Sequence, residues 1–173
     1  MDFKNAVEAA SLRVSTKAEV HDHLWLRSHV GFVELADFMT ELCKKLRGNT
    51  GKHTLHCYSD PMLLSADHAI PLGLLINELV TNAVKYAYPE SSGEIEVSAR
   101  EIDGHLHVEV SDQGAGLPEG FDIEQPRASL GFKVITGMVR QLQGHLTIAN
   151  DRKGARFLLD LPILSQPNEI LTA

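Results

Sequence analysis

The chain has 173 residues, of which 43% are hydrophobic and 23% charged, as in a soluble globular protein with one domain and an appendage. Its formal net charge of -7 and the lack of any basic block argue against nucleic acid as a partner. No apolar run approaches the ~20 residues that span a bilayer, so we expect no membrane segment in this chain. Its two cysteines, Cys43 and Cys57, have no metal-ligand spacing, and we interpret them as small buried hydrophobic residues in a reducing, cytoplasmic setting.

Two helices and a strand are predicted in the first part of the chain. Residues 3–26 carry apolar side chains at helical spacing, a stripe that needs a partner helix because a lone short helix is marginal in water. After the breaker Gly31, residues 34–46 predict a second helix, which ends at the glycine-rich stretch 47–51. Residues 53–58 then alternate as a strand.

The stretch 72–89 predicts a long helix, for which Ser65 or Asp67 can provide the cap. Pro71 near its beginning predicts either a kink or a later start. Pro89 and the serine-glycine segment that follows end the helix.

This helix carries an unusual polar stripe. Glu78, Asn82 and Lys85 fall at i, i+4 and i+7, while leucine, isoleucine and alanine occupy the face that meets the core. An acid, an amide and a cation in one row can hold a metal ion and the phosphates that it bridges. A solvated outer face is the alternative interpretation, since charged outer faces are common.

The second half predicts a hairpin, a loop, a helix and two more strands. Asp103-Gly104 separates two alternating runs and is a strong hairpin signal, and the second run ends at Asp112. Residues 114–127 show no periodicity and have the length of functional lids. The remaining predicted elements are a helix from the cap Ser129 to about Leu142, strands near 146–148 and 157–161, and a loose tail at 165–173.

Two glycine motifs follow the hairpin. In Asp112-Gln-Gly-Ala-Gly116 the carboxylate can accept a hydrogen bond from an exocyclic amine such as that of adenine, and the glycines let backbone approach a ligand. Ser129-Leu-Gly131 at a helix start offers free N–H groups and the positive dipole end to a phosphate. Each motif alone is weak, because such strings are commonly turns or caps, and the usual phosphate loop is absent. Their order in one unit makes the signal strong.

Together these motifs resemble the ATP-binding domain of sensor histidine kinases related to the HWE group, within the superfamily shared with gyrase and MutL. Residues 72–89 resemble the N box, 112–116 the first glycine box and 129–131 a reduced second one, within a resemblance that covers about 33–162. The fold expected is α/β, a two-layer α+β sandwich of the Bergerat ATP-binding type, with a mixed sheet covered on one face by helices. The implied domains are a helical dimerisation remnant at 1–30, a catalytic domain at 31–163 and a tail at 164–173.

The resemblance implies roles for individual residues. Asn82 would bind Mg²⁺, and Glu78 would act as general base or orient the nucleophile. Lys85 would contact phosphate and Tyr86 would lie against the nucleotide. Asp112 would read adenine. The other implied contacts to ATP, through backbone or to phosphate, come from Gly114, Gly116, Arg127, Ser129, Gly131 and Lys133.

Two departures from the family pattern stand out. The family usually has Gly-Thr near the last strand, where this chain has Gly154-Ala155, so one hydrogen bond worth about 1 kcal/mol is weakened. The phosphoacceptor motif is also missing, and residues 20–25 instead resemble the end of the second dimerisation helix. The chain thus looks like an excised fragment or a small natural protein that lost its acceptor, and we do not expect it to phosphorylate itself.

The histidines suggest other roles that we weigh against these. His21, His23 and His29 could be acceptors or ligands, but exposed helix histidines are more often neither. His105 and His107 share one face of a strand, as two metal ligands might, yet no cysteine or carboxylate near them in sequence completes a zinc site.

The function implied is transfer of the γ-phosphoryl group of Mg-ATP to a histidine, for relay to a response regulator. The implied partners are a receiver domain and a histidine-bearing dimerisation domain, with a homodimer in the full protein. Two alternatives stay open. One is a serine kinase of the anti-sigma-factor type that binds a partner protein, and the other is a degenerate phosphotransfer or docking module that no longer binds ATP.

Overall fold

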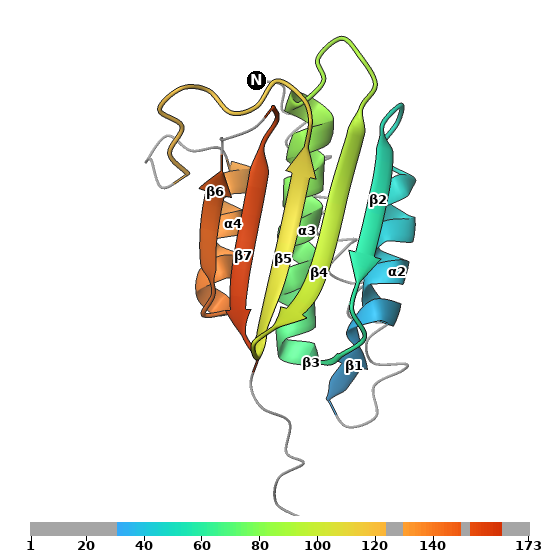
Figure 1. The fold of residues 1–173 in the computed structure, drawn as a ribbon, viewed down its shortest axis with the longest axis vertical. Coiled ribbons are helices and arrows are strands. Elements are labelled where there is room, and N and C mark those ends of the chain that lie inside the picture. The colour runs from blue at the N-terminus through green and yellow to red at the C-terminus, as the bar shows by residue number, and fades with distance from the viewer. Residues whose placement is uncertain (1–30, 124–129, 150–152, 164–173) are drawn as a thin grey trace, which may run out of the picture.

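A mixed five-stranded sheet forms one layer of the protein (Figure 1). The computed structural model describes residues 31–123, 130–149 and 153–163. The strand order is β2-β4-β5-β7-β6, with β2 parallel to β4 and every other pair antiparallel. In chain order the strands are β2 (Thr54–Ser59), β4 (Glu94–Ile102), β5 (His105–Asp112), β6 (His145–Ala149) and β7 (Arg156–Pro162).

Three helices form the second layer and cover one face of the sheet, behind it in the view of Figure 1. They are α2 (Leu35–Arg47), α3 (Ala66–Tyr86) and α4 (Leu130–Gln141). Alternate residues of the strands, such as Leu106, Val108 and Val110 of β5, point into the core beneath these helices and are buried. The predicted two-layer fold is therefore confirmed. The predicted hairpin is confirmed as well, since Asp103 and Gly104 both have positive φ, as its tight turn requires.

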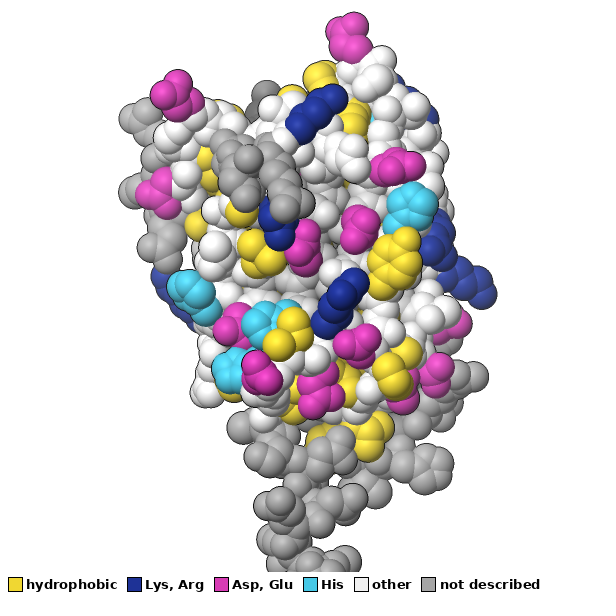
Figure 2. Space-filling model, in the orientation of Figure 1, with side chains coloured by type: hydrophobic (Ala, Val, Ile, Leu, Met, Phe, Trp, Pro, Cys, Tyr) yellow, Lys and Arg dark blue, Asp and Glu magenta, His cyan; other side chains and the backbone are white. Residues whose placement is uncertain are grey.

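The opposite face of the sheet carries acidic, basic and histidine side chains interspersed over the strands (Figure 2). Cross-strand pairs join them: Nδ1 of His105 lies 2.6 Å from Oδ1 of Asp160, and Nε of Arg156 donates to Oε1 of Glu109 at 3.0 Å. The pairing of β7 with β5 brings the carboxylate of Asp160 opposite His107, a neighbour that is distant in sequence. Among the described residues, however, no group of three ligating side chains is placed to hold a metal ion.

A second, smaller sheet escaped the sequence analysis. β1 (Phe32–Glu34) pairs antiparallel with β3 (Leu63–Ser65) beside the N-terminal ends of α2 and α3. Strands of 3 residues are too short to show alternation, so no pattern could predict them.

The long helix begins earlier than Pro71 allowed us to expect. α3 starts at Ala66, so the proposed later start is wrong, and Pro71 lies inside the helix. Ser65 occupies the N-cap position, but its side chain makes no capping hydrogen bond. Its hydroxyl instead lies 2.6 Å from Nδ1 of His68.

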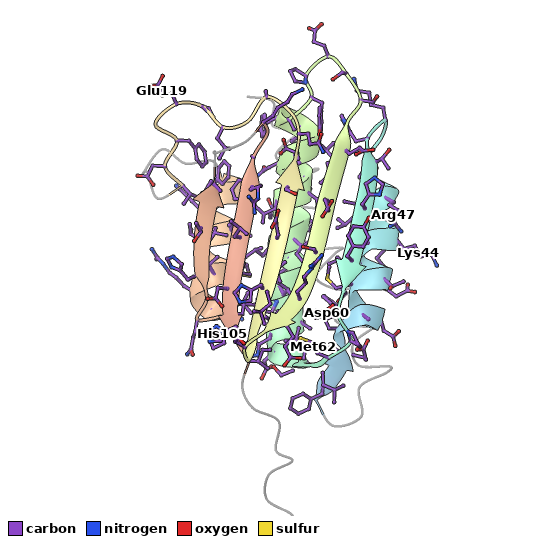
Figure 3. All side chains as sticks on the ribbon, in the orientation of Figure 1. Lys44, Arg47, Asp60, Met62, His105 and Glu119 are labelled. Carbon is purple, nitrogen blue, oxygen red and sulfur yellow. A yellow bond between two sulfur atoms is a disulfide. The ribbon has the colours of Figure 1, made fainter. Side chains whose placement is uncertain are left out.

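The cysteines also differ from the expectation. Cys43 on α2 and Cys57 on β2 form a disulfide, because the helix packs beside the edge strand and brings their Cα atoms within 6.5 Å. The same helix is tied to the strand by Arg47, whose Nε donates to the carbonyl of Leu55 at 3.1 Å (Figure 3). Because Cys43 and Cys57 form a disulfide, they no longer support the expectation of a reducing compartment, which assumed two free thiols.

Several predictions lie outside the described residues. These are the helix at 3–26, the histidines at positions 21, 23 and 29, the lid residue Arg127, the cap Ser129 and the tail at 165–173. Within the described residues, no helix has the length and apolar character needed to cross a membrane.

Candidate nucleotide-binding site

Asp112 ends β5 and is held rigidly at the edge of the sheet. Its side chain is buried, and Oδ1 accepts hydrogen bonds from the backbone N–H groups of Gly114 at 2.9 Å and Ala155 at 3.3 Å. Its own N–H donates to the carbonyl of Ala155 at 3.0 Å. Within the described residues both hydrogen bonds to the carboxylate go to Oδ1, which leaves Oδ2 to accept from a ligand amine.

Two glycines let backbone segments approach this carboxylate closely. A Cβ on Gly114 would lie 2.1 Å from the carbonyl oxygen of Ala87, where the N–H of Ala115 donates at 2.7 Å. A Cβ on Gly154 would lie 1.9 Å from the carbonyl oxygen of Asp112, and Gly154 has a φ of +93°, which L side chains rarely adopt. Only glycine fits either position, so the loop that holds Asp112 is built for close backbone contact.

The polar stripe of α3 runs from the interior to the surface. Glu78 is buried at 6% exposure, Asn82 is half-buried and Lys85 is exposed. The alternative interpretation of a solvated outer face is therefore wrong for the first two residues, because α4 packs against α3. Burial of a carboxyl and an amide on one helix face is costly unless they have partners or a task.

Asn82 shows the clearest sign of an unfilled role. Its Nδ2 is buried, and no hydrogen-bond partner for it exists in the part of the chain that the structure describes. A buried donor without an acceptor costs roughly 1–3 kcal/mol, so such groups call for an explanation. A half-turn of the amide exchanges Nδ2 and Oδ1, so this side chain can present either a donor to phosphate or an oxygen to a hard cation.

A narrow cavity joins the stripe to the sheet edge. Asn82, Tyr86, Asp112 and Gly116 line it, and its remaining wall is mainly apolar. The cavity measures about 50 Å³, much less than the roughly 300–1,000 Å³ of typical ligand pockets. Ala155, at the position of the family's threonine, lines the cavity as well. The apolar wall that sequence analysis did not assign to the site comes from Leu79, Ala83, Ala87, Val110, Leu117, Phe132 and Phe157.

The described part of the lid explains why the cavity is narrow. Phe121 packs edge-on against Phe132 of α4, with ring centroids 5.0 Å apart, and Leu117 lines the cavity itself. Gly116 and Gly120 have φ of 75° and 70°, so glycine is needed where this loop bends. This loop therefore lies against α4 through Phe121 and contributes Leu117 to the cavity wall.

The other predicted residues surround the cavity without lining it. Glu78 lies one turn before Asn82 on α3, and Lys85 lies at the surface near the end of the helix. Gly131 is buried in the first turn of α4, and Lys133 is exposed on the same helix. Gly114 does not line the cavity, but it contacts two wall residues, Ala87 and Asp112.

Comparisons with known proteins agree with this geometry. A family model described as histidine kinase-, DNA gyrase B- and HSP90-like ATPase matches residues 67–165, which is more than half of the chain. This chain belongs to that ATPase family.

The curated relatives are sensor kinases. Sensor histidine kinase PdtaS of Mycobacterium tuberculosis is 30% identical over 157 residues, which cover 87% of this chain and 31% of PdtaS. Blue-light-activated histidine kinase 2 of Erythrobacter litoralis is 28% identical over 119 residues, 67% of this chain and 34% of that protein. The chain therefore spans about a third of the length of the curated relatives that it matches.

Solved structures share the fold. The histidine kinase domain of the Erythrobacter litoralis EL346 blue-light-activated kinase superposes with a TM-score of 0.77 at 21% identity, covering 87% of this chain and 75% of that one. The catalytic domain of histidine kinase ThkA superposes with a TM-score of 0.66 at 19% identity, covering 78% of this chain and 97% of that one. The ATPase family and the histidine kinase fold are thus shown, and with them ATP binding as the property of this domain.

Proposed function

We propose that this domain binds Mg-ATP and transfers its γ-phosphoryl group to a histidine on a dimerisation domain, from which a response regulator receives it. The observation that carries the proposal is that one cavity is lined by the anchored carboxylate of Asp112 and by Asn82, whose Nδ2 has no hydrogen-bond partner among the described residues. One group suits the base and the other suits the phosphates or their metal. We infer the histidine acceptor and the response regulator from the sensor histidine kinases among the relatives.

At the base end, the residues of this chain bind and orient. Oδ2 of Asp112 accepts a hydrogen bond from the exocyclic amine of adenine, while its anchored Oδ1 keeps the carboxylate from rotating. The apolar wall from Val110 and Phe157 covers the faces of the ring and excludes water. Tyr86, which lines the cavity and is 66% exposed, closes its outer side.

At the phosphate end, Asn82 supplies an amide oxygen to Mg²⁺, a hard cation that prefers oxygen ligands. A Mg²⁺ ion held by Asn82 would supply positive charge to offset that of the phosphates. Glu78, buried one turn away, orients the nucleophilic imidazole or holds its proton, and Lys85 and Lys133 attract phosphate from the surface. Arg127, Ser129 and the N-terminal end of α4 complete the proposed phosphate contacts. Since the reaction consumes ATP, the proposal places it in the cytoplasm.

Calorimetric titration of the chain with ATP, with and without Mg²⁺, tests the binding step. We expect saturable binding that Mg²⁺ tightens, and a loss of about ten- to a hundredfold in Asp112→Asn, since a charge-assisted hydrogen bond is worth roughly 1.5–3 kcal/mol. The preference for ATP over GTP should fall in the same variant. No binding by the parent chain, or an unchanged preference in Asp112→Asn, would contradict the proposal.

Incubation with γ-labelled ATP tests the transfer step. The chain alone should acquire no acid-labile phosphate, because phosphoryl transfer needs an in-line nucleophile held close by, and the phosphoacceptor motif is missing. Addition of a histidine-bearing dimerisation domain from a related kinase should produce acid-labile phosphate on that domain. Labelling of the chain alone that disappears in His21→Ala or His23→Ala would show that the acceptor lies here.

A further inference from the structure

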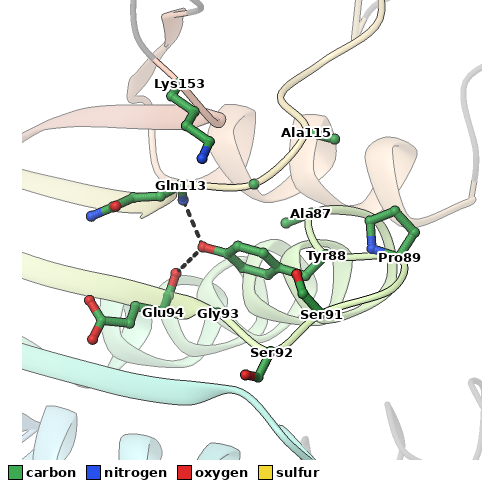
Figure 4. A pocket seen from close by; sticks show the side chains of 11 residues that line it. Ala87, Tyr88, Pro89, Ser91, Ser92, Gly93, Glu94, Gln113, Ala115 and Lys153 are labelled. Carbon is green, nitrogen blue, oxygen red and sulfur yellow. Dashed lines mark hydrogen bonds between the residues drawn. The ribbon is translucent and has the colours of Figure 1, made fainter.

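A second and larger cleft lies behind the glycine loop. It has a volume of about 480 Å³ and is bordered by residues 87–94, by the segment from Gln113 to Ala115 and by Lys153 (Figure 4). It shares Ala87 with the nucleotide cavity. Tyr88, the next residue, lines the larger cleft but not that cavity.

The hydroxyl of Tyr88 joins two segments that are far apart in sequence. It donates to the carbonyl of Glu94 at 2.6 Å and accepts from the N–H of Gln113 at 2.8 Å, as the dashed lines in Figure 4 show. Glu94 begins β4, and Gln113 is the first residue after Asp112. One phenol therefore fixes the start of the glycine loop to the neighbouring strand.

The ring of Tyr88 has little freedom to move. It stacks on the buried ring of His53, with centroids 5.4 Å apart. On another side it lies against Gly93, where a Cβ would come within 2.1 Å of the ring. The ring is thus held by residues that directly precede β2 and β4, and an oxygen on a fixed ring positions its partners well.

Three successive N–H groups of the glycine loop each have an acceptor. That of Gly114 bonds to the carboxylate of Asp112, and that of Ala115 bonds to the carbonyl of Ala87. The first contact stays within the turn that begins at Asp112, and the second joins two backbone groups. The third, from Gln113, depends on the side chain of Tyr88, and it holds the peptide that directly follows the base-reading aspartate.

We propose that Tyr88 is a positioning residue for the nucleotide site, whose hydroxyl fixes the peptide after Asp112 and thereby aims the Asp112 carboxylate at adenine. The inference rests on the nucleotide binding proposed above. It assigns adenine recognition to a residue that touches neither the base nor the cavity. Tyr88 is absent from the lining of the nucleotide cavity, and its hydroxyl acts on affinity through the loop that it holds at Gln113.

The experiment is a double-mutant cycle of Tyr88→Phe with Asp112→Asn, read as dissociation constants for ATP, ADP and GTP. Tyr88→Phe keeps the ring and removes the hydroxyl. It should weaken ATP and ADP equally, by about fivefold, because one net hydrogen bond is lost at the base end. The ratio of ATP affinities with and without Mg²⁺ should not change. In the Asp112→Asn background, Tyr88→Phe should have no further effect.

Tyr58→Phe is the matched control, because Tyr58 is 54% exposed on β2 and lies outside both spaces. It should bind ATP like the parent. ATP binding by Tyr88→Phe within twofold of the parent, or a loss that persists fully in the Asp112→Asn background, would overturn the role of Tyr88. Both results leave the proposed function standing, whereas a parent chain that binds no ATP would overturn the function itself.

Discussion

Asn82→Ala should stabilise the free protein while it removes metal-dependent nucleotide binding. The buried Nδ2 of Asn82 has no acceptor among the described residues, a situation that costs roughly 1–3 kcal/mol. Alanine removes that cost and gains up to about 0.5 kcal/mol of helix propensity in the interior of α3. Lost packing of the half-buried side chain offsets part of this, and we expect a net gain of about 1 kcal/mol. For a chain of this size that corresponds to a rise of about 2–4 °C in Tm.

The assay pairs thermal unfolding without nucleotide with calorimetry in the presence of ATP, with and without Mg²⁺. The variant should melt higher than the parent, yet its affinity for ATP should no longer respond to Mg²⁺. Asn77→Ala is the control, since Asn77 lies on the same helix but does not line the cavity, and it should keep the Mg²⁺ response. A variant that melts lower and still binds Mg-ATP like the parent would refute both the assignment of Asn82 and the reasoning from its unpaired amide.

Three further predictions concern the loop, the departure from the family and the disulfide. Gly114→Ala should lower the affinity for ATP more than tenfold, because its Cβ would lie 2.1 Å from a backbone atom. Gly104→Ala, which is strained by a φ of +78° at the far end of β5, should lower Tm without changing ATP affinity. Equal ATP binding by these two variants would argue against the close backbone approach. Ala155→Thr should tighten ATP about fivefold by supplying the hydroxyl that the family uses, and calorimetry showing no gain would mean that the backbone of Ala155 already suffices. Reduction of the Cys43–Cys57 disulfide, which spans 14 residues, should lower the free energy of unfolding by about 3 kcal/mol in denaturant titrations and leave ATP affinity unchanged. A loss of ATP affinity on reduction would contradict the separation of this disulfide from the site.

Local patterns predicted the elements of this fold well, because each pattern reports on the neighbours of a residue in sequence. Alternation over 106–110 placed β5, and Asp103-Gly104 placed the turn before it. The polar stripe of α3 was also visible, but its depth was not. Glu78 is buried on a helix against which α4, more than fifty residues later in the chain, packs, and no helical period reports on such a distant neighbour.

The parts of the site that sequence analysis missed share this long-range origin. The apolar wall uses Phe132 and Phe157, which read as ordinary core residues until the topology brings them to Asp112. Tyr88 likewise read as the last aromatic residue of a helix, whereas its hydroxyl bridges β4 and the loop after β5. A tyrosine beside a proline gives no signal of that contact, since the acceptor and donor are backbone groups that every sequence contains.

The way Asp112 is held bears on the departure at Ala155. In the family pattern a threonine hydroxyl supports the adenine contact, and its loss suggested weakened binding. In this chain the backbone of Ala155 both donates to Oδ1 of Asp112 and accepts from its N–H, and neither bond depends on the side chain at that position. The sequence requirement instead falls on Gly154, whose missing Cβ lets the two backbones meet. Alanine in place of the threonine therefore removes one contact to the base, while the carboxylate that reads the base keeps its orientation. We expect this departure to lower the affinity for ATP moderately and to preserve the preference for adenine.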